Sequence, residues 1–190
     1  MTDGLLPQRP TPVRAEIASV EWLVEPHWRG VRLIVRRDGN ALHLSDDLPG
    51  IADALRDAIR AESAVIDGIW SPQPAAAEDR SAFVAVDLLE LDGESLLDVP
   101  LLERRRLLES AIAEGDGVRL SPVVKHPIGG WLDSWRGIGF THVIAKHQNS
   151  RYAPGEQNED WLKIPIARDS GSGFVGRLIG SRDRVRRIGD

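Results

Sequence analysis

The stretch 82-AFVAVDLLELDGESLLDVPLLERRRLLES-110 carries the clearest structural pattern in the chain. Its first half is a run of apolar residues that ends at Asp92-Gly93, a dipeptide typical of a tight turn. Its second half has a proline near the start and leucines at helical spacing, which predicts a helix over 99–115 with Gly115 at its C-cap. We expect the Glu and Arg residues of this helix to face solvent.

The flanking sequence extends this pattern in both directions. We expect a hairpin over 31–45 around Asp38-Gly39-Asn40, and helices over 48–61 and near 128–139. Strands are expected at 21–26, 63–70, 117–124, 140–147 and 161–167, with a turn-rich loop over 148–160. Strands and helices interleave irregularly and include hairpins, so the chain is predicted to be α+β rather than a doubly wound parallel sheet.

The composition is that of a globular protein. Of the 190 residues, 42% are hydrophobic and 28% are charged, and the net charge is −5. This balance argues against a surface that is basic throughout, but it is compatible with a local basic groove. The absence of cysteine excludes disulfides, zinc–thiolate sites and a cysteine nucleophile. Without an apolar secretion signal or a segment of membrane-spanning length, the protein is expected to be cytoplasmic.

Arginine is the usual cation in this chain, which makes each lysine of interest. Lys and Arg together number 24, and the lysines are Lys125, Lys146 and Lys163. One interpretation is a genome that favours arginine codons. The other is that a lysine kept against this bias has a function.

The first stretch and a second one, 143-VIAKHQNSRYAPGEQNEDWLKI-164, together resemble the adenylation (nucleotidyltransferase) domain of ATP-dependent DNA ligases, especially those of bacterial end-joining repair. The resemblance covers residues 11–167. It implies two antiparallel sheets flanked by helices, the ATP-grasp-like fold of DNA ligases and mRNA capping enzymes. It also divides the chain into an N-terminal arm (1–12), a ligase-like domain (13–167) and a basic tail (168–190), with no oligonucleotide-binding domain.

In this family, the lysine of a Lys-x-Asp-Gly-x-Arg motif attacks the α-phosphate of ATP and becomes lysyl-AMP. Carboxylates in the middle motifs hold a metal ion and the ribose, because negative charge builds up on the phosphate oxygens as pyrophosphate leaves. Two late lysines contact the α-phosphate and balance that charge.

Several of these positions are replaced here. In 27-HWRGVR-32 the resemblance puts His27 at the nucleophile position and Arg29 at the aspartate position, while Gly30 and Arg32 are kept. The two glutamates that would hold the metal correspond to Ile69 and Thr141.

At the remaining positions of the family pattern, some residues are kept and others are replaced. Asp67, Asp87, Lys146 and Lys163 are retained. Val86 takes the place of an aromatic residue beside the adenine, Pro165 replaces the second late lysine, and residues 41–50 lack the family's Arg-Asn-Gly turn.

The sequence therefore predicts a ligase-like pseudoenzyme linked to DNA repair, with no catalytic residue and no metal site. Its candidate ligands are ATP or another nucleotide bound without Mg²⁺, or a DNA phosphate, and a DNA-repair protein is a candidate partner. The predicted ligand-binding residues, which form a degenerate nucleotide pocket, are His27, Arg29, Arg32, Asp67, Asp87, Lys146 and Lys163.

Alternatives remain at this point. Lys146 and Lys163 could bind an anion together with Arg29 and Arg32, or they could form salt bridges with Asp67 and Asp87. The chain could be an active ligase or adenylyltransferase with His27 as a displaced nucleophile. It could also be an interaction module with an apolar surface patch around Trp131 or Trp135. The tail, 177–190, could contact DNA phosphates or be a solvated chain end.

Overall fold

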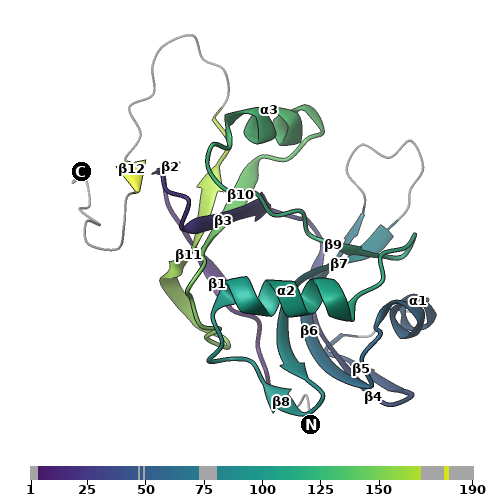
Figure 1. Ribbon diagram of the computed structural model, residues 1–190. Helices are drawn as coiled ribbons and strands as arrows, with labels where there is room; N and C mark the ends of the chain where they lie inside the picture. Colours follow the sequence, from purple (N-terminus) through teal and green to yellow (C-terminus); the bar gives the residue numbers. More distant parts are fainter. Residues whose placement is uncertain (1–3, 47, 49, 73–80, 168–177, 180–190) are drawn as a thin grey trace.

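The computed structural model describes residues 4–46, 48, 50–72, 81–167 and 178–179. Within these ranges, two main β-sheets face each other and three helices pack around them (Figure 1). The smaller sheet has the order β1-β11-β10-β3, and we call it the small sheet. Its strands are β1 (Arg9–Pro12), β11 (Gln157–Pro165), β10 (His142–His147) and β3 (Trp22–Pro26).

The second sheet, which we call the large sheet, has the order β5-β4-β6-β7-β8, with β9 pairing alongside β7. Its first hairpin turns at Gly39, whose φ of 55° is the left-handed conformation that glycine adopts without strain. The strands of the large sheet are β4 (Val31–Asp38), β5 (Ala41–Leu44), β6 (Ser63–Pro72), β7 (Ser81–Leu91), β8 (Glu94–Ser95) and β9 (Val118–Leu120).

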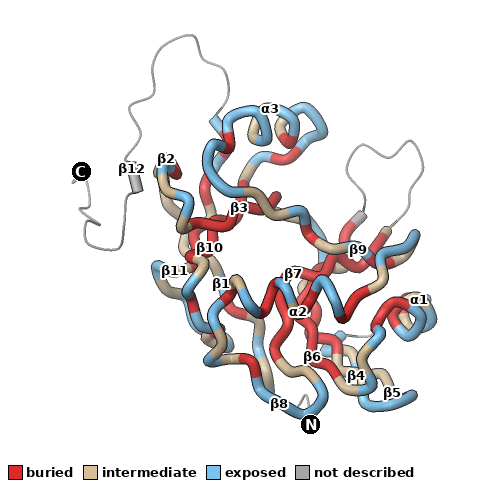
Figure 2. The backbone as a smooth tube through the Cα atoms, viewed as in Figure 1, coloured by how far each residue is buried: buried red, intermediate tan, exposed pale blue. Residues whose placement is uncertain are grey.

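The main core lies between the large sheet and two helices, α1 (Ile51–Ala58) and α2 (Leu101–Ala111). Strand alternation directs Leu33, Ile66 and Phe83 into this layer, where they are fully buried with Leu55 of α1 and Leu108 of α2. Figure 2 shows buried residues along β6 and β7 and exposed residues on the outer side of α1. Apolar burial on this face holds the large sheet and its helices together.

The small sheet has its own core on its outer face. There, Val143, Ala145 and Leu162 pack against Trp135 of α3 (Gly129–Gly137). A third cluster, which includes Ile34, Tyr152 and Trp161, joins the two sheets. The inner face of the small sheet, turned toward the large sheet, is therefore free of α3, and it is where the candidate site lies.

The α+β architecture predicted from the sequence is confirmed. Each main sheet is largely antiparallel and also contains one parallel pair, β1 with β11 and β7 with β9. Strand β11 begins at residue 157 rather than 161, because Gln157 and Asn158 pair with Arg9 and Pro10. Part of the expected N-terminal arm is thus an edge strand.

The expected end of the second helix was wrong. Helix α2 ends at Ala111, and Ile112 leaves it in an extended conformation to bridge Ile59. Gly115 instead donates its backbone N–H to the carbonyl of Val118, so it belongs to the turn before β9.

The predicted basic tail, 168–190, falls largely outside the described residues. Within it, β12 (Leu178–Ile179) pairs in parallel with β2 (Glu16–Ile17). None of the helices in the described ranges is both long and apolar enough to cross a lipid bilayer.

Candidate functional site

Three strands place the candidate residues in two rows on the inner face of the small sheet. Glu25, Ile144 and Lys163 lie directly opposite one another on β3, β10 and β11 and form the first row. In the next row, His142 faces Pro165 and accepts, through its backbone carbonyl, a 3.0 Å hydrogen bond from the backbone N–H of His27. Residues opposite one another on adjacent strands share a face, so these rows are continuous.

One end of this face, which we call the closed end, is occupied by a buried ion pair between Lys146 and Glu25. The Lys146 ammonium lies 2.6 Å from Glu25 Oε1 and 4.0 Å from the ring centroid of Trp161. Both charged side chains are about 95% buried. The adjoining cavity has a volume of about 70 Å³, and the second oxygen of Glu25 and the indole N–H of Trp161 have no hydrogen-bond partner among the described residues.

Asp67 is held by an arginine from the neighbouring strand. Arg32 Nε and Nη2 donate to the two carboxylate oxygens at 2.5 and 2.6 Å, and the Tyr152 hydroxyl donates to Oδ2 at 2.7 Å. Burial alone would lower the pKa of Arg32, but the Asp67 carboxylate outweighs it and raises that pKa. Burial, followed by the same carboxylate, also raises the pKa of Tyr152. Both donors therefore stay protonated at neutral pH.

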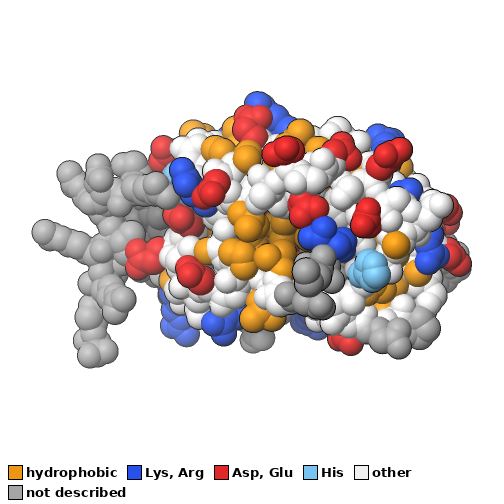
Figure 3. Space-filling model, turned by 90° about the horizontal axis from the view of Figure 1, so that it is seen from below, with side chains coloured by type: hydrophobic (Ala, Val, Ile, Leu, Met, Phe, Trp, Pro, Cys, Tyr) orange, Lys and Arg blue, Asp and Glu red, His pale blue; other side chains and the backbone are white. Residues whose placement is uncertain are grey.

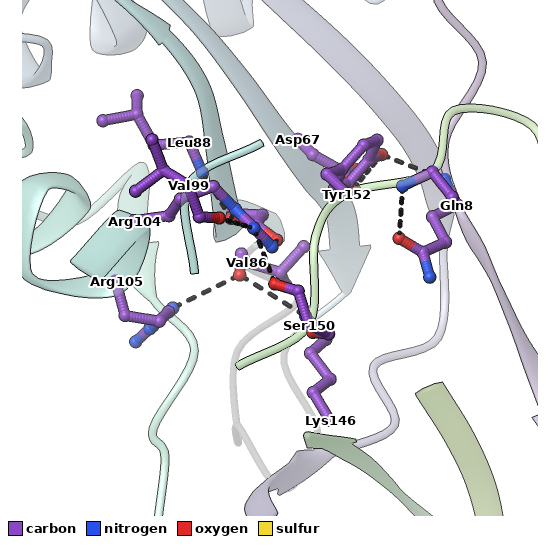
Figure 4. Close-up of polar contacts among 12 residues, drawn as sticks. Gln8, Asp67, Val86, Leu88, Val99, Arg104, Arg105, Lys146, Ser150 and Tyr152 are labelled. Atoms are coloured by element: carbon purple, nitrogen blue, oxygen red, sulfur yellow. Dashed lines mark hydrogen bonds and ion pairs between the residues drawn. The ribbon is translucent and has the colours of Figure 1, made fainter. Parts of the chain in front are cut away.

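Asp87 is held in the same way from helix α2. Arg104 Nε and Nη2 each donate to one Asp87 oxygen at 2.8 Å, and its Nη1 donates to the carbonyls of Val99 and Ser150 (Figure 4). Both side chains are fully buried. Arg105 is also buried and donates to the Ser121 carbonyl at 2.9 Å. The expectation that the charged residues of this helix face solvent was therefore wrong for Arg104 and Arg105.

The opposite end of the same face, which we call the open end, is basic. An open pocket of about 480 Å³ is lined by Arg14, His142 and Lys163, together with Pro12, Val13 and Pro165. The ring of His27 lies edge-on to that of His142, with 6.1 Å between centroids. No acidic residue lines this pocket within the described part of the chain.

Burial and nearby positive charge favour the neutral forms of His27 and His142. Burial first, and then Lys163, His142, Arg32 and Arg29, lower the pKa of His27 from 6.5 to about 4. Burial and then Lys163 lower the pKa of His142. Each imidazole would have to gain its proton next to existing positive charge, which is unfavourable.

The predicted site residues therefore divide into two groups. Arg32, Asp67, Asp87 and Lys146 lie in buried or partly buried ion pairs. The alternative in which Lys146 and Lys163 form salt bridges with Asp67 and Asp87 is not observed, because Arg32 and Arg104 occupy those carboxylates and Glu25 holds Lys146.

The second group comprises His27, Lys163 and Arg29. Lys163 forms no ion pair with any described residue, and Arg29 is exposed on the turn after β3. Trp131 on α3 and Ile138 just after it are exposed, whereas Trp135 is buried.

Sequence reasoning missed Glu25, Arg104, Tyr152 and Trp161, and also Arg14 and His142 of the open pocket. Glu25 could have been found, because it lies two residues before His27 and a strand repeats its facing direction every two residues. Arg104 could also have been found, since it lies three and four residues from Leu101 and Leu108 on one helical face. The positions of Tyr152 and Trp161 depend on contacts between the sheets, which no local pattern reveals.

The surface charge of the described chain is not uniformly basic. Figure 3, viewed from below, shows acidic and basic side chains interspersed around an apolar patch. Basic groups gather at the open end without an acidic partner among the described residues, which favours an anion in that pocket.

Comparison with known proteins gives a consistent result. The sequence model of the ATP dependent DNA ligase domain matches residues 52–164, more than half of the chain. DNA ligase 2 of Methanosarcina acetivorans is 27% identical over 86% of this chain and 37% of its own length. The multifunctional non-homologous end joining DNA repair protein LigD of Mycobacterium tuberculosis is 30% identical over 78% of this chain and 22% of its own.

A solved structure of mycobacterial DNA ligase D complexed with ATP and MES is 28% identical and superposes with a TM-score of 0.68. The match covers 87% of this chain and 61% of that structure. The chain thus spans about a fifth to just over a third of these two curated relatives. Taken together, the family match and the shared fold show that the chain belongs to the ATP-dependent DNA ligase domain family.

Proposed function

We propose that this chain is a ligase-fold domain that does not form a covalent AMP intermediate and instead binds a phosphate-bearing ligand in DNA repair. One observation carries the proposal. The carboxylates between the sheets are engaged by cations, while the basic residues of the open end have no acidic partner among the described residues.

Transfer of AMP from ATP needs charges that act together. A neutral nucleophile must attack phosphorus while a metal ion offsets the charge of the departing pyrophosphate. Here Asp67 and Asp87 accept bidentate hydrogen bonds from arginines, and Glu25 is paired with Lys146. Recruiting any of them to a metal would leave a buried arginine or lysine without its partner, which is costly.

The space available favours a ligand at the open end rather than at the closed end. Small-molecule sites are commonly about 300–1,000 Å³ in volume. The cavity beside Glu25, Lys146 and Trp161 is about 70 Å³, whereas the open pocket is about 480 Å³. The name of one relative refers to non-homologous end joining and one similar structure contains ATP, so a DNA end and a nucleotide are both candidate sources of the phosphate.

One observation favours the alternative of an active adenylyltransferase. The low pKa of His27 keeps its imidazole neutral at pH 7, which is the form that can attack a phosphate. Under this alternative, ATP would lose pyrophosphate and leave AMP on a ring nitrogen of His27.

Mass spectrometry of the intact protein separates the two functions. The protein is incubated with ATP and Mg²⁺ or Mn²⁺ and analysed at neutral pH, because phosphoramidates are acid-labile. The proposal predicts no AMP adduct on the native chain. An adduct that is lost in His27→Ala but kept in His43→Ala, a control at an exposed histidine of β5, would establish the alternative.

A further inference from the structure

The open end combines fixed and titratable basic groups on one sheet face. Lys163 lies opposite Pro12 of β1 and Ile144 of β10, and His142 lies opposite Pro165, two residues after Lys163. Lys163 and His142 are therefore diagonal neighbours on adjacent strands, with a typical separation of about 7–8 Å between such positions. Arg14 follows two residues after Pro12 and lines the same pocket.

The hydrogen bonding of His142 leaves one ring nitrogen available. Its Nδ1 lies 2.9 Å from the Thr141 hydroxyl. Its Nε2 has no partner among the described residues, and the side chain lines the pocket with Lys163 and Arg14. A tetrahedral oxyanion in this pocket could accept hydrogen bonds from an ammonium, a guanidinium and, once protonated, an imidazolium.

We propose that the pocket of Arg14, His142 and Lys163 binds a phosphate group and that His142 takes up a proton when it does so. This inference rests on the proposed phosphate-binding function and adds its regulation. Protonation gives the site a third positive charge, so binding strengthens as the pH falls.

The surrounding charges support this direction. Burial and then Lys163 of β11 disfavour a charged His142. Arg14, after β1, lines the same pocket, and the His27 ring lies edge-on to the His142 ring. The carboxylate on this face nearest in the strand register, Glu25, is bound to Lys146. A bound dianion would reverse the local potential and raise the pKa of His142.

NMR of the histidine rings tests whether anion binding is coupled to protonation of His142. Sulfate serves as the probe, because it stays a dianion between pH 4 and 9 and so does not titrate itself. The pKa of each histidine is measured with saturating sulfate and with sodium chloride at equal ionic strength. We expect sulfate to raise the pKa of His142 by about one unit, which corresponds to about tenfold tighter sulfate binding when His142 is protonated. His43, exposed on β5, is the internal control and should not move.

One variant, measured without and with sulfate, completes the test. Without sulfate, Lys163→Met should raise the pKa of His142, because a repelling charge is removed. With sulfate, the same variant should lose most of the further rise. An unchanged His142 pKa in sulfate, or an equal shift at His43, would overturn the inference.

Competition then identifies the source of the phosphate. ATP and a 5′-phosphorylated DNA duplex are compared at pH 5.5 and pH 8 for displacement of sulfate from His142. The ligand that competes more strongly at the lower pH is the preferred one, and failure of both to compete would also overturn the inference. The test is independent of the proposed lack of catalysis, since an AMP adduct would refute that function without changing the response to sulfate.

Discussion

The two ends of the inner face of the small sheet contain similar residues in opposite electrostatic states. At the closed end, Lys146 is buried against Glu25 and Trp161. At the open end, Lys163, on the neighbouring strand, faces a pocket with Arg14 and His142 and has no acidic partner among the described residues. The first lysine is part of the folded core, and the second is available to a ligand. Whether a cation has a function here depends on its partner more than on its residue type.

The largest expected effect concerns Asp87, which is fully buried with Arg104. Asp87→Asn would leave the guanidinium buried without a counter-charge, so the free energy of unfolding should fall by about 3–5 kcal/mol. The change in the free energy of unfolding is measured by urea denaturation. The matched control, Asp98→Asn, disrupts an exposed ion pair with Arg151 and should change little. Equal effects of the two substitutions would mean that the Asp87–Arg104 pair does not stabilise the fold.

Glu25→Gln should be the next most damaging substitution, because it leaves the Lys146 charge buried. We expect a loss of about 3 kcal/mol, at the lower end for such pairs, since Trp161 still stabilises the ammonium. The double variant Glu25→Gln/Lys146→Met should recover most of this loss. If the double variant is as unstable as the sum of the single variants, the two side chains are not coupled.

Gly30 lies in the turn that joins the two sheets. Its φ is 138°, and a Cβ atom would lie 1.9 Å from the Trp70 carbonyl oxygen. Gly30→Ala should therefore cost about 1–3 kcal/mol and displace the turn that carries His27. Gly39→Ala is the control, because that glycine also has positive φ but no neighbouring atom within 4 Å of a Cβ. Thermal unfolding that ranks the two variants equally would contradict the close approach at Gly30.

The smallest expected effect is on the pH dependence of stability and involves His27. The pKa of His27 is lowered on folding from 6.5 to about 4, so the unfolded chain takes up a proton first. Its contribution to stability is complete above pH 6.5 and is lost as the pH falls toward 4. His27→Gln should therefore flatten the decline in urea midpoint between pH 7 and pH 5. A variant that declines as steeply as the native chain would show that burial and the neighbouring charges do not lower the pKa of His27.

Much of the fold was predictable from local pattern. The alternation in 31–45, the apolar run in 82–91 and the spacing of leucines after Pro100 predict the hairpin, the long strand and helix α2. The start of β11 was not predictable, because it is set by pairing with β1, about 150 residues earlier in the chain. Non-local pairing of this kind leaves little signal in a short window of sequence.

Part of the site was predicted from the sequence, but neither the pairings among its residues nor Arg14 and His142 of the open end were. The resemblance selected Asp67, Asp87 and Lys146, yet their partners proved to be Arg32, Arg104 and Glu25. Arg104 was assigned to solvent because arginine is seldom fully buried. Helical spacing places it between Leu101 and Leu108, and the nearby Asp87 carboxylate makes its burial favourable.

The most direct test of the account is to restore the nucleophile alone. If AMP transfer is prevented by the engagement of the carboxylates with arginine and lysine, His27→Lys should still form no covalent AMP adduct with ATP and Mg²⁺ by intact mass. An adduct on this single variant would show instead that only the nucleophile was missing and that the carboxylates remain able to support catalysis.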